Sequence, residues 1–316
     1  SRLLSAIFGV LTIYFVFLVG KRLYNREVGL ISAGILSVCM GFSSVNHFAQ
    51  GTSLVNLLYI ITIYFCLKSF DKNFNYKDFF IACLFGGLAL TAKYNGIILI
   101  LPLITAYIMI FYKNRNLNKG IKGILFYIIG IFIGWPALLT NFKKYCAFFF
   151  IDNYNWLFIE HPGYIYPGTG SNYFLRLFNY FIELIHIFGL PLSSFILGGL
   201  LYCIFVLFNR RDGDVKKYKI GILLSSILPW ILIISCFTKP TTIKYMILIT
   251  PAFAVIGGVA IYKFLVSFKF YKTIKYFLVT LSFIFSFLYT LSSDLVFSKN
   301  DTRYKAAEWV DKNIPV

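Results

Sequence analysis

The sequence predicts an all-α, polytopic bundle of about ten membrane-spanning helices. Hydrophobic residues make up 59% of its 316 residues and charged residues only 13%, about half of the charged fraction of an average soluble domain. Apolar runs recur along the whole chain, and roughly 20 apolar residues cross the hydrocarbon core of a bilayer as one helix. Continuous runs such as residues 97–111 exclude a transmembrane barrel, whose strands alternate between apolar and polar residues.

Ten apolar stretches are the predicted spans. They are residues 3–19, 28–42, 53–67, 79–92, 95–112, 121–140, 190–208, 220–237, 245–262 and 274–293. Several early spans are short for an independent crossing, so we expect them to be buried among neighbours or to end in water-filled cavities. Gly130 and Gly134 lie one turn apart in the sixth span and predict close helix–helix packing. The aromatic-rich residues 148–158 and 173–188 predict helices that lie in the membrane interface.

The net charge of +18 is distributed as a topology signal. Most Lys and Arg residues lie in five alternate connections, at residues 21–26, 68–77, 113–122, 210–219 and 263–275. The positive-inside rule places these connections in the cytoplasm, where they also favour contact with anionic membrane lipids. We therefore expect a plasma-membrane protein with both ends of the chain outside, and no nucleic-acid partner. The chain starts at Ser1 without an initiator Met, and we expect it to be truncated at both ends.

The longer connections lie on the predicted outer side, at residues 141–190 and 294–316. We expect residues 1–293 to form the transmembrane domain and residues 294–316 to begin an outer soluble domain. The short basic loops contain no glycine-rich phosphate cradle, and His47, His161 and His186 lie on or near the outer side. Any chemistry is therefore expected outside, where an activated donor must be carried by a lipid because no nucleotide is expected there.

Two lysines at the predicted outer surface are candidate phosphate ligands. Lys93 precedes Tyr94 between two apolar spans, and Lys244 precedes Tyr245 at the start of another. A lysine at membrane depth is costly unless it snorkels or pairs. Each is therefore either an interfacial anchor beside an aromatic belt or a counter-charge for a lipid phosphate.

The outer segments hold the remaining candidates. Asp152, Glu160 and His161 lie in a connection broken by Pro and Gly residues, and a carboxylate beside a histidine can supply acid/base chemistry. His47 belongs to the uncharged polar stretch 43–52, predicted as a loop that is either a capped turn or a rim for sugar hydroxyls. Glu183 and His186 share a helix face and are interpreted as a polar face. The six cysteines have no metal or redox spacing.

The order of these features resembles the C-type membrane glycosyltransferases, near the protein O-mannosyltransferases and the lipopolysaccharide sugar transferases. Five motifs carry the resemblance. They are Arg2-Leu3-Leu4-Ser5-Ala6-Ile7-Phe8-Gly9, Lys21-Arg22-Leu23-Tyr24 with Val28-Gly29-Leu30, Gly87-Leu88-Ala89-Leu90-Thr91-Ala92-Lys93-Tyr94, Lys244-Tyr245-Met246 through Pro251, and Asp301-Thr302-Arg303 with Ala306-Ala307-Glu308-Trp309-Val310. The fourth has Lys244 where the family has Arg.

The resemblance implies an inverting transfer of a sugar from a polyprenyl-phosphate donor to a lipid, glycan or protein acceptor outside. It also implies a base, usually Asp, in a loop that would precede Ser1, and a second acidic residue where this chain has Gly51-Thr52-Ser53. The expected phosphate ligands are Lys93 and Lys244, because cations stabilise the charge that develops on a leaving phosphate.

Other residues complete the expected site. Glu160 and Asp152 are the candidates for acceptor binding or proton handling. Tyr94, Tyr245, His47 and His161 are candidate substrate ligands. No cofactor and no metal-ligand cluster is evident, although a loop carboxylate and the donor phosphate could together hold a divalent ion.

Two other function classes remain open from the sequence. A transporter or lipid flippase would place ionisable groups near the bilayer midplane and show repeated halves, whereas the polar residues here gather at the predicted outer rim. A non-catalytic membrane scaffold is compatible with the missing acidic residues. An outer cavity bounded by residues 141–190 would favour transfer, and a central two-sided path would favour transport.

Overall fold

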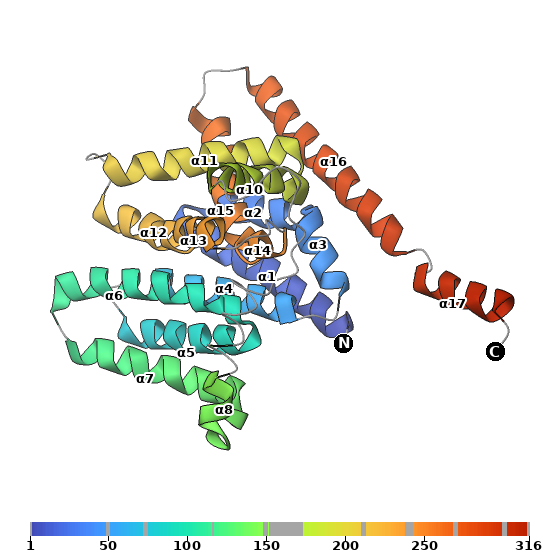
Figure 1. Cartoon of the computed structure of the whole chain (residues 1–316). Helices are drawn as coiled ribbons and strands as arrows, with labels where there is room; N and C mark the ends of the chain where they lie inside the picture. The colour runs from blue at the N-terminus through green and yellow to red at the C-terminus, as the bar shows by residue number, and fades with distance from the viewer. Residues whose placement is uncertain are drawn as a thin grey trace.

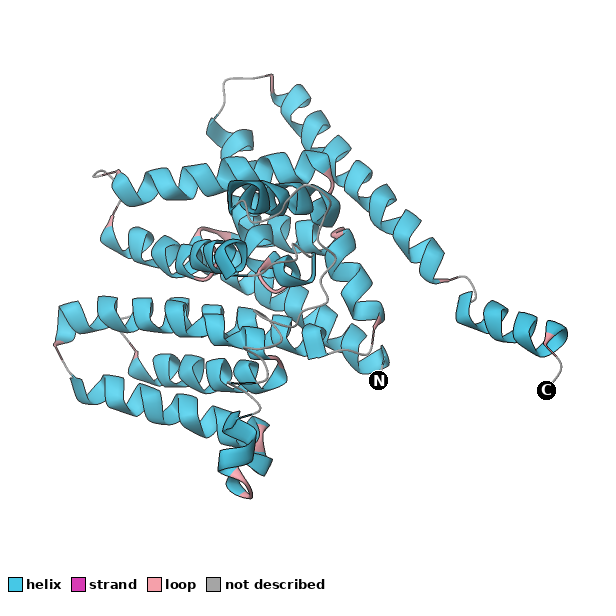
Figure 2. Ribbon diagram, viewed as in Figure 1, coloured by secondary structure: helices cyan, strands magenta, loops and turns pink. Residues whose placement is uncertain are grey.

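The computed structural model describes residues 2–48, 51–71, 75–115, 117–147, 151, 173–209, 213–237, 243–267, 271–298 and 302–314. These residues form helices joined by short turns, with no strand in the described ranges (Figures 1 and 2). The all-α class is therefore as predicted.

Eight helices or consecutive helix pairs in the described residues are long and apolar enough to cross a membrane. They are α1 (Arg2–Leu23), α4 (Gly51–Lys68), η1 (Tyr94–Leu99) with α6 (Ile100–Asn114), α7 (Leu117–Gly134), α11 (Leu190–Phe208), α12 (Asp214–Ser225) with α13 (Leu228–Phe237), α15 (Thr250–Ser267) and α16 (Lys272–Phe297). A bent pair, α2 (Arg26–Ser37) and α3 (Met40–His47), makes a ninth if it is one span. The shorter α5 (Tyr76–Ala92) packs between α4 and α7.

Several shorter elements complete the fold. They are η2 (Pro136–Leu139), α8 (Phe142–Ala147), α10 (Tyr173–Phe188), α14 (Ile243–Ile247) and α17 (Thr302–Asn313). The helix predicted for residues 173–188 is confirmed as α10. It packs on α3, α11, α13 and α14 with Tyr180, Leu184 and Ile187 buried, so it is part of the bundle. The helix predicted for residues 148–158 lies outside the described residues except for Ile151.

Three predicted boundaries are wrong, for local physical reasons. Residues 43–47, predicted as loop, belong to the helix α3, which is bent by 59° from α2. The span predicted to continue to residue 140 ends at Gly134, because Pro136 has no N–H to extend the ladder and instead begins η2. The last span continues through Asp294 to Phe297, past the boundary predicted at residue 293.

The close helix packing predicted at Gly130 and Gly134 is confirmed. A Cβ atom on Gly130 would collide with the carbonyl oxygen of Leu84, and one on Gly134 with the hydroxyl of Thr91. Gly87 on α5 likewise lies directly against the backbone of α7. The helices α5 and α7 are therefore in backbone contact, which is the small-residue packing expected in a membrane.

The bundle has two chemically different ends. The C-terminal ends of α6 and α11 lie at one end, at the left in Figure 1, whereas α1 begins and α17 ends toward the other. Ion pairs join helices at the first end, which we call the basic end. There Asp71 pairs with Arg22 and, at 3.3 Å, with Lys219, while Lys68 pairs with Asp78 at 2.8 Å. The opposite end, which holds α3, α8 and η1, is called the terminal end.

Candidate functional site

Lys93 lies at the terminal end, where α5 stops. The residue is the C-cap of α5 and has an extended backbone with φ −161° and ψ 137°. The chain then continues directly into η1 at Tyr94. The Lys93 Nζ donates a 3.0 Å hydrogen bond to the Thr52 Oγ1 in the first turn of α4. Lys93 is half-buried, so its ammonium is partly shielded from solvent while remaining at the end of the bundle.

The start of α4 adds to the positive field at Lys93. Gly51, the first residue of α4, lies so close to α5 that a Cβ atom there would be 2.9 Å from the Ala92 carbonyl oxygen. The N-terminus of a helix carries a partial positive charge and unpaired N–H groups, which favour anions. An ammonium beside the start of an 18-residue helix therefore forms a place suited to a phosphate or carboxylate.

Tyr94 and Tyr245 form the second part of this site. The two hydroxyls are close enough to affect each other's ionisation, and Tyr245 is only 5% exposed. Burial raises the pKa of the Tyr245 hydroxyl above its ordinary value, so this group stays neutral. The Trp230 Nε1 donates a 2.8 Å hydrogen bond to the Tyr245 carbonyl oxygen, which holds α14 against α13.

These contacts bring two predicted motifs together. Lys93 and Tyr94 come from the turn between α5 and η1, and Tyr245 comes from the Lys-Tyr motif more than a hundred residues later. Lys244 lies in α14 next to Tyr245, but its side chain is outside the described part of the structure. Asp152, Glu160 and His161 lie outside the described residues altogether.

His47 contacts a carboxylate that the sequence did not single out. Its Nε2 lies 3.1 Å from the Asp294 Oδ1, and Ser43 donates a 3.1 Å hydrogen bond to the same oxygen. These contacts join α3 to α16. Both side chains are partly exposed, at 46% for His47 and 34% for Asp294. The sequence did offer a signal for Asp294. This carboxylate directly follows the last apolar run, on the same predicted side of the membrane as the polar stretch that holds His47.

Buried polar groups beside Lys93 were also missed. Ser53 and Asn56 on α4 and Asn95 on η1 have buried side-chain atoms without a hydrogen-bond partner among the described residues. Asn56 is fully buried and both of its amide atoms are unpaired. Such groups are uncommon in proteins, and an asparagine in an otherwise apolar span was the signal that could have identified this one. Ser53 and Asn56 follow Thr52, the partner of Lys93, within the first two turns of α4.

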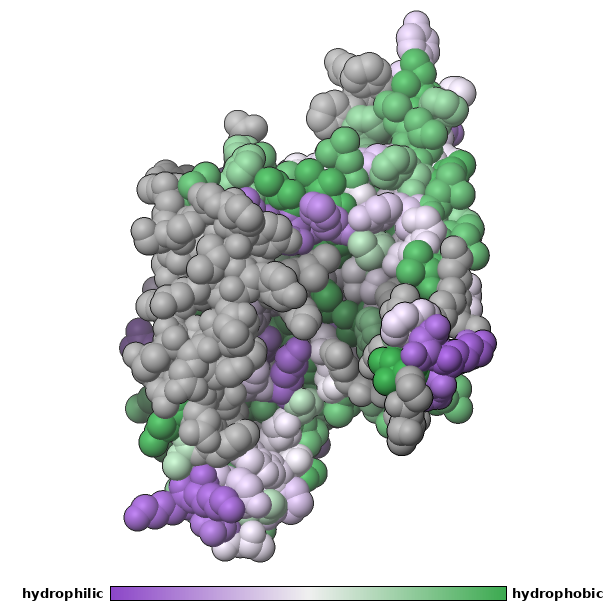
Figure 3. Space-filling model, turned by 45° about the vertical axis from the view of Figure 1, so that its right-hand side comes forward, coloured by the Kyte–Doolittle hydropathy of each residue, from purple (hydrophilic) through white to green (hydrophobic). Residues whose placement is uncertain are grey.

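The surface at the terminal end is hollowed. Seen from this side, hydrophilic and hydrophobic side chains both border the hollow (Figure 3). In the described residues, no group of three or more His, Cys, Asp or Glu side chains is placed to hold a metal ion.

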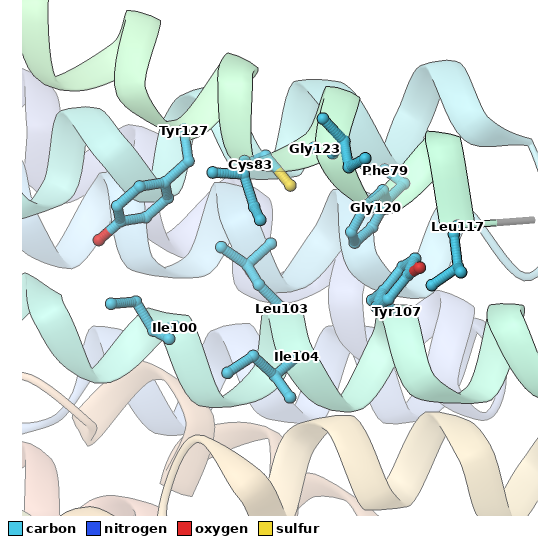
Figure 4. Close-up of a pocket in the computed structure, with 12 residues that line it drawn as sticks. Phe79, Cys83, Ile100, Leu103, Ile104, Tyr107, Leu117, Gly120, Gly123 and Tyr127 are labelled. Atoms are coloured by element: carbon cyan, nitrogen blue, oxygen red, sulfur yellow. The ribbon is translucent and has the colours of Figure 1, made fainter.

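An apolar groove of about 590 Å³ lies between α5, α6 and α7 (Figure 4). Along its length, the groove extends from Ile100, directly after η1, to Leu117 at the start of α7 (Figure 4). The side chains of Leu103, Ile104 and Tyr107 face it from α6. Since almost the whole lining is apolar and belongs to candidate membrane spans, the groove suits a hydrocarbon chain rather than a polar substrate.

Comparisons with known proteins give one family and a set of related folds. Residues 1–139 match the family described as dolichyl-phosphate-mannose-protein mannosyltransferase. No curated protein sequence gives a significant match.

Among solved structures, ArnT from Cupriavidus metallidurans bound to undecaprenyl phosphate superposes with a TM-score of 0.60 at 16% identity. It is matched over 83% of this chain and 46% of its own. The archaeal oligosaccharyltransferase AglB from Archaeoglobus fulgidus, in complex with an inhibitory peptide and a dolichol-phosphate, gives a TM-score of 0.54 at 14% identity. That match covers 98% of this chain and 46% of AglB.

This chain thus spans slightly less than half of the length of ArnT and AglB. The matches extend over most of the bundle, and the family match covers α1 to η2. Together they confirm the resemblance inferred from the five motifs at the level of the fold. The chain has the fold of the C-type membrane glycosyltransferases.

Proposed function

We propose that this chain is the membrane part of a glycosyltransferase that moves a sugar from a polyprenyl-phosphate donor to an acceptor on the outer face of the plasma membrane. The observation that carries the proposal is the Lys93 ammonium, hydrogen-bonded to Thr52 at the start of α4. Further support comes from the solved relatives, because ArnT was solved with undecaprenyl phosphate and AglB with a dolichol-phosphate.

The proposed reaction uses the site as follows. The acceptor nucleophile forms a bond to the anomeric carbon of the sugar while the bond from that carbon to the phosphate oxygen breaks. The negative charge that builds up on the departing polyprenyl phosphate is stabilised by Lys93 and by the N-terminus of α4. Lys244 is proposed to contribute a second cation. The neutral hydroxyls of Tyr94 and Tyr245 supply further hydrogen-bond partners.

The acceptor loses its proton to a carboxylate. Glu160 and Asp152 are the proposed groups for acceptor binding or proton handling in this chain, with His161 and His47 as further substrate ligands. The acceptor is a lipid, a glycan or a protein, and a divalent ion held by a carboxylate and the donor phosphate is compatible with this chemistry. The basic end is proposed to face the cytoplasm, as its lysines and arginines favour.

The apolar groove offers a place for the polyprenyl tail. A donor with its phosphate at Lys93 can direct its hydrocarbon chain past η1 toward Ile100, where the groove begins. This arrangement keeps the charged group at the terminal end and the tail at membrane depth, which is the order that a membrane lipid requires.

The test compares Lys93→Gln with Lys144→Gln in the full-length protein. Lys144 is an exposed lysine of α8 and serves as the matched control. Loss of a charge-assisted hydrogen bond is expected to slow transfer from a polyprenyl-phosphate-linked sugar by about 10- to 150-fold, while K144Q keeps the wild-type rate. Lys93→Arg retains the charge and is expected to recover part of the loss.

Binding of polyprenyl phosphate is measured on the same variants. Weaker binding by K93Q assigns Lys93 to recognition of the phosphate, whereas unchanged binding with slower transfer assigns it to a later step. Membrane levels and thermal midpoints must be equal among the variants. Wild-type transfer and binding by K93Q would leave Lys93 with only the anchoring role and would overturn the site.

A further inference from the structure

Three uncharged polar side chains lie buried close to the Lys93–Thr52 contact, with atoms that have no hydrogen-bond partner in the described part of the structure. They are Ser53 and Asn56 on α4 and Asn95 on η1, which are 1%, 0% and 3% exposed. The unpaired atoms are the Ser53 hydroxyl oxygen, both amide atoms of Asn56 and the Asn95 Oδ1. We call these three residues the buried polar cluster.

The contacts of neighbouring residues on α4 show which way Asn56 faces. Residues three and four apart share one face of a helix, so Thr52, Asn56 and Tyr59 form one stripe along α4. At one end of the stripe, Thr52 accepts its hydrogen bond from Lys93. At the other end, the Tyr59 hydroxyl donates a 2.7 Å hydrogen bond to the Ser226 Oγ. Asn56 lies between these two contacts, so its face of α4 is turned toward η1 and the junction of α12 with α13.

Two interrupted spans border this face of α4. The span formed by η1 and α6 begins with a 3₁₀ helix at Tyr94, and η1 packs on α4. The span formed by α12 and α13 is interrupted between Ser225 and Leu228. Irregular backbone at membrane depth is tolerated where protein buries it or where it lines a polar cavity, and membrane transporters bind polar substrates at such interruptions. The cluster therefore lies where a polar ligand is best accommodated within the bundle.

The chemistry of the cluster defines the ligand. An asparagine amide offers two donors and one acceptor, and a serine hydroxyl both donates and accepts. Hydroxyl groups of a ligand match these groups, because they also donate and accept. None of the three side chains carries a charge, so a charged group entering the cluster finds no counter-charge among them and its desolvation is costly. The expected ligand is therefore uncharged and rich in hydroxyls.

The position of the cluster relative to Lys93 suits the sugar of a lipid-linked donor. Thr52 and Asn56 are four residues apart, which separates them by about 6 Å along the helix axis. In a polyprenyl-phosphate sugar, the ring is bonded directly to the phosphate. A phosphate held at Lys93 and Thr52 thus places the ring about one helical turn from Asn56, within reach of its amide.

We propose that the buried polar cluster binds hydroxyl groups of the donor's sugar, and that the donor accordingly carries a neutral, hydroxyl-rich sugar. The inference rests on the proposed function, because the phosphate site at Lys93 anchors the donor. The cluster is closed to solvent, so the side chains between α4 and η1 must move apart to admit the ring. Unpaired buried groups destabilise this closed form, and the sugar supplies the partners that they lack.

The test separates the sugar from the phosphate by comparing ligands of the full-length protein. Binding of polyprenyl phosphate, and of polyprenyl phosphates that carry mannose, glucose or galactose, is measured in detergent on wild type and on Asn56→Leu. Leucine keeps the branched shape of the side chain and removes the amide. The matched control is Thr62→Val, which removes another fully buried polar group of α4. That hydroxyl is already paired, at 2.8 Å, with the Leu58 carbonyl oxygen.

Wild type is expected to bind at least one sugar-bearing lipid more tightly than bare polyprenyl phosphate. N56L should lose about 30-fold in affinity for that lipid and keep its affinity for the bare lipid. Its thermal midpoint should be equal or higher, because an apolar side chain replaces an unpaired amide. T62V should keep both affinities. Ser53→Ala removes one unpaired hydroxyl, should lose about 5-fold for the sugar-bearing lipid, and tests the cluster even if N56L does not fold.

Equal losses for both kinds of lipid in N56L and S53A would overturn the proposal, because the cluster would then have a structural role only. Unchanged affinity for both would also overturn it and would leave the cluster with bound water only. A wild type that prefers none of the sugar-bearing lipids would contradict it as well. K93Q reports separately on the proposed function, since it should lose affinity for bare polyprenyl phosphate. Failure of that loss overturns the phosphate site, whereas failure of N56L alone overturns only the sugar site.

Discussion

The Nε2 of His47 lies 3.1 Å from the Oδ1 of Asp294, and this contact ties the end of α3 to the last span, α16. Ser43 donates to the same carboxylate, and Ser44 lies within 3.5 Å of the Ser293 hydroxyl. The polar stretch that the sequence analysis interpreted as a capped turn or a sugar rim thus has a packing role. The polar side chains of Ser43, Ser44 and His47 contact α16.

The first prediction concerns this contact. His47→Ala and Asp294→Ala are expected to show a coupling of about 0.2–1 kcal/mol in a double-mutant cycle of unfolding, because the pair is partly exposed and screened by solvent. Reversible unfolding in mixed micelles supplies the free energies. Strictly additive effects of the two substitutions would show that the contact does not stabilise the α3–α16 junction.

The second prediction uses two adjacent glycines of α11. A Cβ atom on Gly199 would lie 2.5 Å from the Ile256 carbonyl oxygen of α15, whereas one on Gly198 meets no atom within 4 Å. Gly199→Ala is expected to cost about 1–3 kcal/mol through overpacking. Gly198→Ala is expected to be neutral or to stabilise by up to about 1 kcal/mol through helix propensity. Equal shifts in the thermal midpoints of the two variants would contradict the prediction that a methyl group fits at Gly198 and not at Gly199.

The third prediction concerns the tyrosine pair at the candidate site. Tyr94→Phe removes the hydroxyl that interacts with the hydroxyl of the buried Tyr245. A buried hydroxyl left without a partner costs about 1–3 kcal/mol, which is the expected loss in the free energy of unfolding. The double variant Tyr94→Phe/Tyr245→Phe removes both hydroxyls and should cost less than the sum of the single variants. If the effects of the two single changes add up to that of the double change, the interaction between the two hydroxyls contributes nothing to the free energy of unfolding.

The fourth prediction concerns topology. A cysteine at Asn313 should react with a membrane-impermeant maleimide on intact cells. One at Asn118, in the first turn of α7, should not, because the basic end is proposed to face the cytoplasm. Both positions are exposed. Background labelling is low because Cys39, Cys66, Cys83 and Cys203 are buried, and Cys146 and Cys236 are replaced by serine. The reverse labelling pattern would invert the bundle and move the candidate site to the cytoplasm.

Much of the fold follows from the sequence, because each span is a continuous apolar run and lipid requires such a run to be helical. Polar helices are harder to predict. The helix α3 contains Ser43, Ser44, Asn46 and His47, and nothing in that stretch by itself indicates that α10 and α16 would cover it. Helix breaks were missed where a proline or a turn interrupts an apolar run, as at Pro136.

The candidate site was predictable in part. Lys93, Tyr94 and Tyr245 were identified because charged and aromatic residues at the ends of apolar runs are conspicuous. Thr52 and Asp294 were not, since their importance depends on partners 41 and 247 residues away. The chemistry of each side chain can be read from the sequence, whereas the pairing depends on which helices become neighbours.

The backbone contact between α5 and α7 has a mechanical consequence for the apolar groove. Gly87 and Gly130 leave no room for these two helices to slide or rotate against each other, so two walls of the groove form one rigid body. The third wall, α6, packs on α12, α4 and η1 beyond its contact with α5. If the donor tail lies in this groove as proposed, a bulkier hydrocarbon chain must displace α6, because α5 and α7 cannot separate without losing their backbone contact.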